Sequence, residues 1–268
     1  MFNKIHNMTC QEGFKLLPDQ SIQAIVTSPP YAEQRISQYG GIPEKDYPQW
    51  TVDYLEKAKR IMKPNGSVFI NIRTNIEDGV ISDYVIKTIL ALRENGWKNN
   101  EELIWIKAGP PLGSCLRPRR NWESIHWFSL SRQPYVDLLA NGKKSNRVGF
   151  VKAKGVGDWI NGVSDGLEEG IARCTDVIDI PTSYCDRSKG NTHPAQYPAE
   201  LAEWLINLSS KPGDVICDPF MGSGSTAVAA KKLNRQYVGF EINPEYIKIA
   251  DARLFRTSEL DKDIWDYS

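Results

Sequence analysis

The sequence predicts an α/β fold in which a mostly parallel sheet is flanked by helices and has an antiparallel edge. Short apolar runs alternate with helix-like stretches along most of the 268 residues, as is typical of a parallel sheet. Residues 214–242 resemble a strand, a glycine-rich turn, a helix and a second strand. Two strand-like runs, 102–107 and 123–130, have no helix between them, which favours an antiparallel pair. Together these patterns predict one Rossmann-like domain over residues 1–268, long enough to bury a core.

The first predicted strand, 21–27, leads into Ser28-Pro29-Pro30-Tyr31. The two prolines end the strand, because neither has an N–H for the sheet and both fix φ. The stiff loop that results carries a hydroxyl, two free carbonyls and an aromatic ring. This equipment suits a planar base that bears an amino group. The alternative interpretation is a Pro-Pro turn with a tyrosine in the core.

The next elements are predicted from periodicity and stop signals. They are a turn-rich loop at 32–48, a helix at 50–62, a strand at 67–72, a helix at 80–95, and the strands at 102–107 and 123–130. Apolar residues recur at helical spacing in the first helix, and Asn95-Gly96 ends the second. Trp105 and Trp127 lie in strands and are expected in the core.

Residues 134–190 have the weakest periodicity and hold many of the glycines. After them, residues 198–210 are predicted to form a helix, because Pro198 suits a helix start and leucines line one face.

The glycine-rich unit follows as a strand at 214–220, a helical stretch at 227–236 and a strand at 236–242. Gly222 and Gly224 allow a tight turn and close approach of the backbone to a ligand. Glu241, at the end of the last strand, can bind both hydroxyls of a ribose. The unit therefore predicts a site for a nucleoside-containing cofactor, with a plain glycine-rich turn as the alternative.

Four motifs in order resemble those of the amino-methylating DNA methyltransferases of the β class. They are Thr27 to Tyr31 (TSPPY), the turn at 60–67 (RIMKPNGS), the segment at 192–198 (THPAQYP) and Asp218 to Thr226 (DPFMGSGST). In that class the catalytic motif comes first and the cofactor motif last, as here. The resemblance covers nearly the whole chain. It implies a catalytic half at 1–136 and a cofactor half at 190–256.

The resemblance implies S-adenosylmethionine as the cofactor. The positions that would bind it are Asp218, Pro219, Phe220, Met221, Gly222, Ser223, Gly224, Thr226, Glu241, Ile242, Thr192, His193, Pro194, Thr9 and Cys10. The chain departs from the family at Thr9, where an acid is usual. The adenine end of the cofactor would then be contacted by Thr9, by backbone, or not at all.

The resemblance also assigns the chemistry to Ser28, Pro29, Pro30 and Tyr31. The Pro29 carbonyl and Ser28 would hold the amino group of a flipped base, and Tyr31 would stack on it. Family members with serine before Pro-Pro mostly modify N4 of cytosine, so this base is expected, with N6 of adenine as the alternative. No Pro-Cys motif is present, which argues against methylation at carbon 5.

The net charge of the chain does not indicate a DNA-binding protein, but the clustering of its basic residues does. The 33 basic and 33 acidic residues balance, whereas a DNA-binding protein normally has a basic surface. The basic residues that we expect to contact DNA are Arg117, Arg119, Arg120, Lys143, Lys144 and Arg147. Residues 137–175 are expected to be an insertion that recognises the target sequence, with a disordered insertion as the alternative. Tyr39, Tyr47 and Trp50 either line DNA or anchor their loop.

Composition favours a cytoplasmic enzyme. The expected assembly is a monomer or a homodimer, and a cognate endonuclease is a candidate partner. No run approaches the ~20 apolar residues of a membrane span, and the first residues lack the apolar region of a signal peptide. The five cysteines are scattered and the histidines dispersed, so no metal site is expected. A cofactor-binding regulator without methyl transfer, or an enzyme acting on RNA or on a protein glutamine, remains an alternative.

Overall fold

The computed structural model describes residues 1–33, 41–107, 117–118, 120–144, 171–182 and 197–265. Within them, eight strands form one sheet in the order β1-β12-β11-β2-β3-β7-β6-β10. Their bounds are β1 Lys4–His6, β2 Ile22–Thr27, β3 Met62–Ile72, β6 Lys98–Ile106, β7 Trp122–Ser129, β10 Val177–Asp179, β11 Val215–Asp218 and β12 Gln236–Phe240. Only β7 runs antiparallel to its neighbours. The predicted mostly parallel α/β sheet with an antiparallel part is confirmed.

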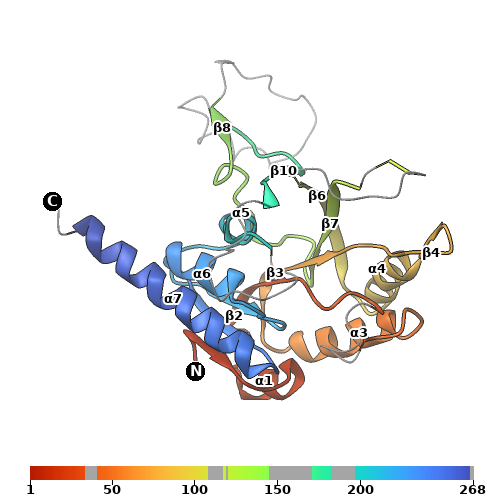
Figure 1. The fold of residues 1–268 in the computed structure, drawn as a ribbon, viewed down its shortest axis with the longest axis horizontal. Helices are drawn as coiled ribbons and strands as arrows, with labels where there is room; N and C mark the ends of the chain where they lie inside the picture. Colours follow the sequence, from red (N-terminus) through yellow and green to blue (C-terminus); the bar gives the residue numbers. More distant parts are fainter. Residues whose placement is uncertain (34–40, 108–116, 119, 145–170, 183–196, 266–268) are drawn as a thin grey trace.

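Helices cover both faces of this sheet (Figure 1). They are α1 Cys10–Leu16, α3 Tyr47–Ala58, α4 Tyr84–Glu94, α5 Ala199–Ser209, α6 Ser225–Lys232 and α7 Pro244–Trp265. The helices α1, α3 and α4 pack on the face that includes Ile25 of β2, whereas α5, α6 and α7 pack on the face of Ala24 and Val26. Side chains of β2 point to both layers and all its residues are buried, as expected for a central parallel strand.

Two predicted helix boundaries are wrong for identifiable reasons. The helix expected at 50–62 ends at Ala58, because Met62 pairs with Ile22 and so opens β3. The helix expected at 80–95 begins at Tyr84, because Val80–Ile81 form β5, which pairs with β4 (Ile76–Glu77) across a hairpin. Asp78 and Gly79 both have positive φ there, as a tight hairpin turn requires.

The antiparallel pair β6–β7 exists, but it is not the edge of the sheet. The three-residue strand β10 pairs parallel with β6 and lies outside it. Strand β10 comes from the stretch of weak periodicity, where three residues cannot establish a pattern. The small strands β8 (Lys143–Lys144) and β9 (Ile171–Ala172) pair antiparallel in the same part of the chain. Trp105 is buried and Trp127 packs against the same core, which confirms their predicted positions.

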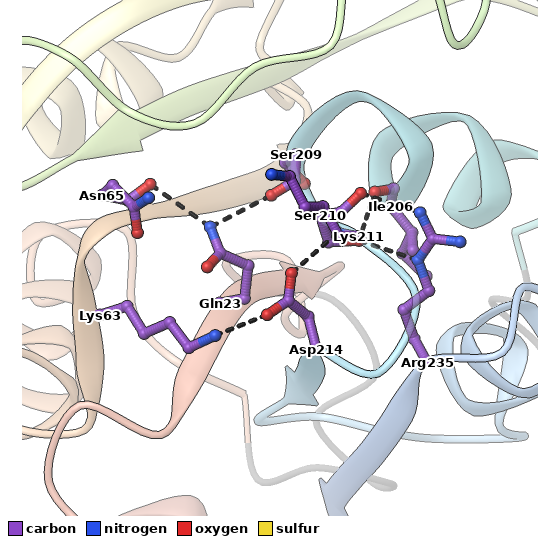
Figure 2. Close-up of polar contacts among 9 residues, drawn as sticks. All are labelled: Gln23, Lys63, Asn65, Ile206, Ser209, Ser210, Lys211, Asp214 and Arg235. Atoms are coloured by element: carbon purple, nitrogen blue, oxygen red, sulfur yellow. Dashed lines mark hydrogen bonds and ion pairs between the residues drawn. The ribbon is translucent and has the colours of Figure 1, made fainter.

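A polar network joins the two halves of the chain at the amino end of the central strands (Figure 2). The Lys63 ammonium lies 2.5 Å from one oxygen of Asp214, and the other oxygen accepts a hydrogen bond of 2.8 Å from the Lys211 N–H. The buried amide of Gln23 donates to the carbonyls of Asn65 and Ser209, at 3.4 and 3.3 Å. These contacts link β2 and β3 to the end of α5 and the start of β11.

Replacing Asp214 by alanine is expected to lower the free energy of unfolding by about 1 to 2 kcal/mol, because a half-buried ion pair and a backbone bond are lost together. Thermal denaturation measures this change. The control is Glu245→Ala, which removes an ion pair to Lys248 that is mostly exposed. We expect that control to stay within about 0.5 kcal/mol of the unmodified protein, and equal effects of the two substitutions would contradict the role given to Asp214.

Candidate functional site

Segments far apart in the sequence meet at one edge of the sheet. The strands β2, β3, β6, β11 and β12 run in the same direction, so their carboxyl ends lie together, and the opposed strand β7 begins there. Ser28–Tyr31 follows β2, the turn after Asp218 follows β11, and Glu241 follows β12. In an open α/β sheet this edge is where ligands bind.

Asp218 connects the proline loop to the glycine-rich turn. Its carboxylate is fully buried and accepts hydrogen bonds from the hydroxyl of Thr27, at 2.7 Å, and of Thr226, at 2.6 Å. The Phe220 N–H donates to it at 3.0 Å, and the Tyr197 hydroxyl lies at 3.4 Å. Burial raises the pKa of Asp218, and these hydrogen bonds oppose the rise. All these partners belong to the protein, so the Asp218 carboxylate links the proline loop, the glycine-rich turn and the start of α6 to one another.

The glycine-rich turn is fixed by its neighbours. The Gly222 N–H donates to Glu241 at 2.9 Å, and the Met221 N–H donates to the Phe240 carbonyl at 3.0 Å. Gly224 has a φ of +84°, and a Cβ there would lie 2.7 Å from the Cβ of Ala250 in α7. Both the conformation and the close approach of α7 therefore require glycine at this position.

Glu241 is 6% exposed, and each of its carboxylate oxygens accepts one backbone N–H. The second bond comes from Asn243, at 2.8 Å. Burial raises the pKa of Glu241, while the bonds from Asn243 and Gly222 oppose the rise. A carboxylate has about four acceptor positions, so two remain for the hydroxyls of a ribose. Ile242, the next residue, is exposed.

Three aromatic residues, Phe220, Trp50 and Tyr54, pack against one another next to this turn. The ring of Phe220 lies 5.3 Å from that of Trp50 and 5.2 Å from that of Tyr54, measured between centroids. The Tyr54 hydroxyl is buried and has no hydrogen-bond partner among the described residues. Burial raises its pKa well above the usual value, and the nearby Cys10 and Asp218 raise it further.

An unpaired buried hydroxyl, a carboxylate with free acceptor positions and a glycine turn together fit a polar cofactor with a ribose and a planar base. Tyr47 is fully buried against Trp50, which places it as an anchor of its segment, and Tyr39 lies outside the described residues.

Thr9 caps helix α1. Its hydroxyl accepts the Glu12 N–H at 3.3 Å, and the Glu12 carboxylate accepts the Thr9 N–H at 3.1 Å, which forms a capping box. Cys10 is buried in the core, and burial raises the pKa of its thiol to about 12. The sequence contains a signal for this cap, because threonine is followed three residues later by glutamate. The prediction for Thr9 followed the family's acidic position and did not use this signal.

Replacing Thr9 by alanine is expected to lower the free energy of unfolding by about 1 kcal/mol, the usual effect of losing an N-cap. Its effect on cofactor affinity is expected to be less than about twofold, because the threonine side chain already serves the helix. Chemical denaturation and calorimetric titration with S-adenosylmethionine measure the two quantities. A large loss of affinity at unchanged stability would instead assign Thr9 to the cofactor.

The proline loop contacts residues that the sequence did not single out. The Tyr31 hydroxyl donates to Glu123 at 3.1 Å, and Glu123 is also bonded to the Lys107 ammonium. Burial and the Glu123 charge raise the pKa of Tyr31 well above its usual value, and a hydrogen bond with the Ser28 side chain opposes the rise. No motif indicates Glu123, because a glutamate at the start of a strand is common on protein surfaces.

Two arginines predicted to contact DNA are engaged with a neighbouring loop. Arg120 donates to the carbonyl and the hydroxyl of Thr74, at 2.9 and 2.6 Å, and Arg117 donates to the Gly79 carbonyl. Burial and the nearby Arg73 lower the pKa of Arg120. Lys143 is exposed in β8, which also contains Lys144. Arg119, Arg147, Thr192, His193 and Pro194 lie outside the described residues.

Across the described ranges, no helix combines the length and apolar character needed to cross a membrane. The same part of the chain contains no group of three or more histidine, cysteine or acidic side chains arranged to hold a metal ion.

Comparison with known proteins matches the chain and its fold to one family. The model of a family described as DNA methylase, the N6 and N4 methyltransferases, matches residues 22–252. The type II methyltransferase M.BglII of Bacillus subtilis is 28% identical over 253 residues, which cover 92% of this chain and 68% of that protein.

Two solved structures share the fold. The PvuII DNA methyltransferase, which is named as cytosine-N4-specific, has a TM-score of 0.74 and 22% identity, with 93% of this chain and 85% of that chain covered. The complex of M1.HpyAVI with S-adenosylmethionine has a TM-score of 0.62 and 21% identity, with 94% and 98% covered. Since the family model spans most of the chain and the fold agrees, this protein belongs to the N6/N4 DNA methylase family.

Proposed function

We propose that this protein transfers a methyl group from S-adenosylmethionine to the exocyclic N4 of a cytosine that is flipped out of duplex DNA. The observation that carries the proposal is the neutral serine of the Ser28–Tyr31 loop, joined through Thr27 and Asp218 to the glycine-rich turn. The loop and the turn would thereby bring a base and a cofactor together at one edge of the sheet. The PvuII DNA methyltransferase, which shares this fold, is named as cytosine-N4-specific, and this supports the choice of base.

The cofactor would lie over the glycine-rich turn. Glu241 would accept the ribose hydroxyls, and Phe220 and Gly222 would line the bound molecule, with residues 192–194 covering its methionine end. When bound, S-adenosylmethionine supplies a methyl group that is activated by a positively charged sulfur. The protein itself then needs only to bind, orient and exclude water, which accounts for most of the expected acceleration.

The target base would be held by the proline loop. Its amino nitrogen is a poor nucleophile, because the lone pair is delocalised into the ring. Hydrogen bonds from the amino group to the Pro29 carbonyl and to the Ser28 oxygen would hold it in line with the methyl group. Flipping costs a few kcal/mol of unstacking, and stacking on Tyr31 would recover part of it.

The remaining assignments follow from the same proposal. Residues 137–175 would recognise the target sequence, between a catalytic half at 1–136 and a cofactor half at 190–256. Arg119, Arg147, Lys143 and Lys144 would contact the DNA backbone, and Arg117 and Arg120 would do so through the loop that they hold. A cognate endonuclease is a candidate partner in the cell, and the cytoplasm is the expected compartment.

The test is to identify the product. The protein is incubated with S-adenosylmethionine and mixed-sequence duplex DNA, and the DNA is digested to nucleosides for mass spectrometry. We expect N4-methylcytosine. N6-methyladenine would contradict the assigned base and keep the family's reaction, whereas bound cofactor without any methylated nucleoside would favour RNA, a protein or a regulatory role.

A further inference from the structure

Glu123 lies at the carboxyl edge of the sheet, where the proline loop meets β7. It is the second residue of β7, and 5% of its surface is exposed. One carboxylate oxygen is bonded to the Lys107 ammonium, just after β6, and lies 3.9 Å from the Arg73 guanidinium, just after β3. The other oxygen accepts the Tyr31 hydroxyl at 3.1 Å. The carboxylate thus connects two cations at the ends of neighbouring strands to the aromatic residue of the proline loop.

Lys107 is itself held in place. Its ammonium lies 4.8 Å from the centre of the Trp105 ring, within the range of a cation–π contact. Trp105 is buried and pairs with Glu123 across the β6–β7 ladder, and its indole N–H donates to the Ile180 carbonyl at 2.8 Å. The position of the carboxylate is therefore set by the sheet and not by the proline loop.

Tyr31 takes its orientation from this carboxylate. The residue lies in a stretch without helix or strand, and its side chain is partly buried against the core cluster that includes Ile25 and Tyr84. Packing against one side of a ring restricts its tilt only in part. A hydrogen bond at the hydroxyl fixes the far end of the ring, and a charged acceptor makes that bond stronger than a neutral acceptor would.

We propose that Glu123, fixed by Lys107, is a positioning residue that holds the Tyr31 ring in the orientation in which it stacks on the flipped base. The inference rests on the proposed function, because that function supplies the base. A side chain that becomes ordered only on binding reduces the affinity. A ring that is oriented before the base arrives avoids this loss, so more of the stacking energy is available to offset flipping. Glu123 acts in this way without touching the base.

This role predicts that the effect of Glu123 depends on how firmly the target base is paired. Flipping breaks the base pair and unstacks the base, and it costs less where the base is already mismatched. A misoriented Tyr31 ring would slow methyl transfer to a paired base, because fewer bases would be flipped. The same defect would matter less for a mismatched target. A merely structural role of Glu123 would slow the reaction on both targets equally.

Glu123→Ala tests this role. The measured quantity is the single-turnover rate of methyl transfer on two duplexes that carry the mapped target base either paired or mismatched. We expect the rate on the paired duplex to fall about 5- to 50-fold, somewhat less than for the loss of a whole stacking ring. The rate on the mismatched duplex should fall less than about threefold. The affinity for S-adenosylmethionine should stay within about twofold, because the glycine-rich turn is untouched.

Two further variants identify the contact. Glu123→Gln keeps a polar group beside Tyr31, whose hydroxyl can accept from an amide as well as donate, so the rate should return to within about threefold of the unmodified protein. Tyr31→Phe keeps the ring and removes the hydroxyl, so it should reproduce the loss in Glu123→Ala. Both of these substitutions remove the same bond, and the double variant should be no slower than the slower single variant. If Glu123→Ala does not fold, Tyr31→Phe gives the same comparison of paired and mismatched targets.

The matched control is Asp214→Ala, which also takes a carboxylate from an ion pair with a lysine of the same sheet. That pair lies at the amino end of the central strands, so the control should lose stability and keep its rate on both duplexes.

An equal loss on the paired and the mismatched duplex, or additive effects of Glu123→Ala and Tyr31→Phe, would overturn the inference while the unmodified protein remains active. If the product is N6-methyladenine, the proposed base is wrong, and the same comparison with adenine as the target decides the inference. A protein that methylates no duplex DNA would overturn the proposed function and the inference together.

Discussion

Replacing Ser28 by alanine is expected to reduce the rate of methyl transfer roughly 100- to 1000-fold, the usual effect of removing one preorganised hydrogen-bonding group from a reacting centre. The alanine methyl group cannot accept from the amino group of the base, so the nitrogen is no longer held in line with the methyl group. The glycine-rich turn and Glu241 are untouched. The affinity for S-adenosylmethionine should therefore stay within about twofold.

Single-turnover assays with radiolabelled cofactor and a calorimetric titration measure the two quantities. The matched control is Ser21→Ala, just before the same strand, where the hydroxyl binds the Pro18 carbonyl at the opposite end of β2. This control should methylate at the rate of the unmodified protein. Undiminished turnover in Ser28→Ala would refute the role given to that serine.

Replacing Asp218 by alanine is expected to lower the free energy of unfolding by about 3 to 5 kcal/mol, a large part of the total stability of a domain. The hydroxyl of Thr27 and the N–H of Phe220 would lose their acceptor, and a cavity would open where β2, β11 and α6 meet. Denaturation in urea measures this loss. A change below about 1 kcal/mol would show that these groups find other partners.

Asp218→Asn keeps the shape and one acceptor oxygen, so its cost should be smaller. It also gives a test by pH. Burial raises the pKa of Asp218 above its ordinary value of 3.8, so the folded protein binds a proton that the unfolded chain has released. Through this group, stability is greatest below pH 3.8 and falls as the pH rises through the folded pKa. The asparagine variant should lack this contribution, which comparison of the two stability curves would reveal.

The sequence was sufficient for the fold class and for the two loops of the site, because both depend on local signals. Two prolines must end a strand, and glycines followed by a helix and a terminal acid have few structural solutions. The edge strand β10 could not be predicted, since three residues from a segment without periodicity form a strand only by pairing with β6.

The parts of the site that could not be predicted depend on tertiary contacts. Glu123 acquires its environment from residues that follow β3 and β6, and the nearest of them in the sequence, Lys107, lies 16 positions before it. Thr27 reaches Asp218 only after β2 has paired with β11, and Tyr197 reaches it only after the segment before α5 has packed against the end of β11. Thr9 differs from these residues, because its capping box is a local signal that is complete in four residues and can be predicted from the sequence alone.

The three residues of β1 also cover the backbone edge of β12. Without β1, the backbone N–H and C=O groups of β12 would form an open edge, and such an edge pairs readily with other chains. The Glu241 N–H bonds to the His6 carbonyl, and Asn7 holds the carbonyls of Glu241 and Ile242. Substitutions in residues 4–7 that prevent this pairing should therefore make the protein aggregate more readily. Bound cofactor should reduce this aggregation, because it stabilises the same end of β12.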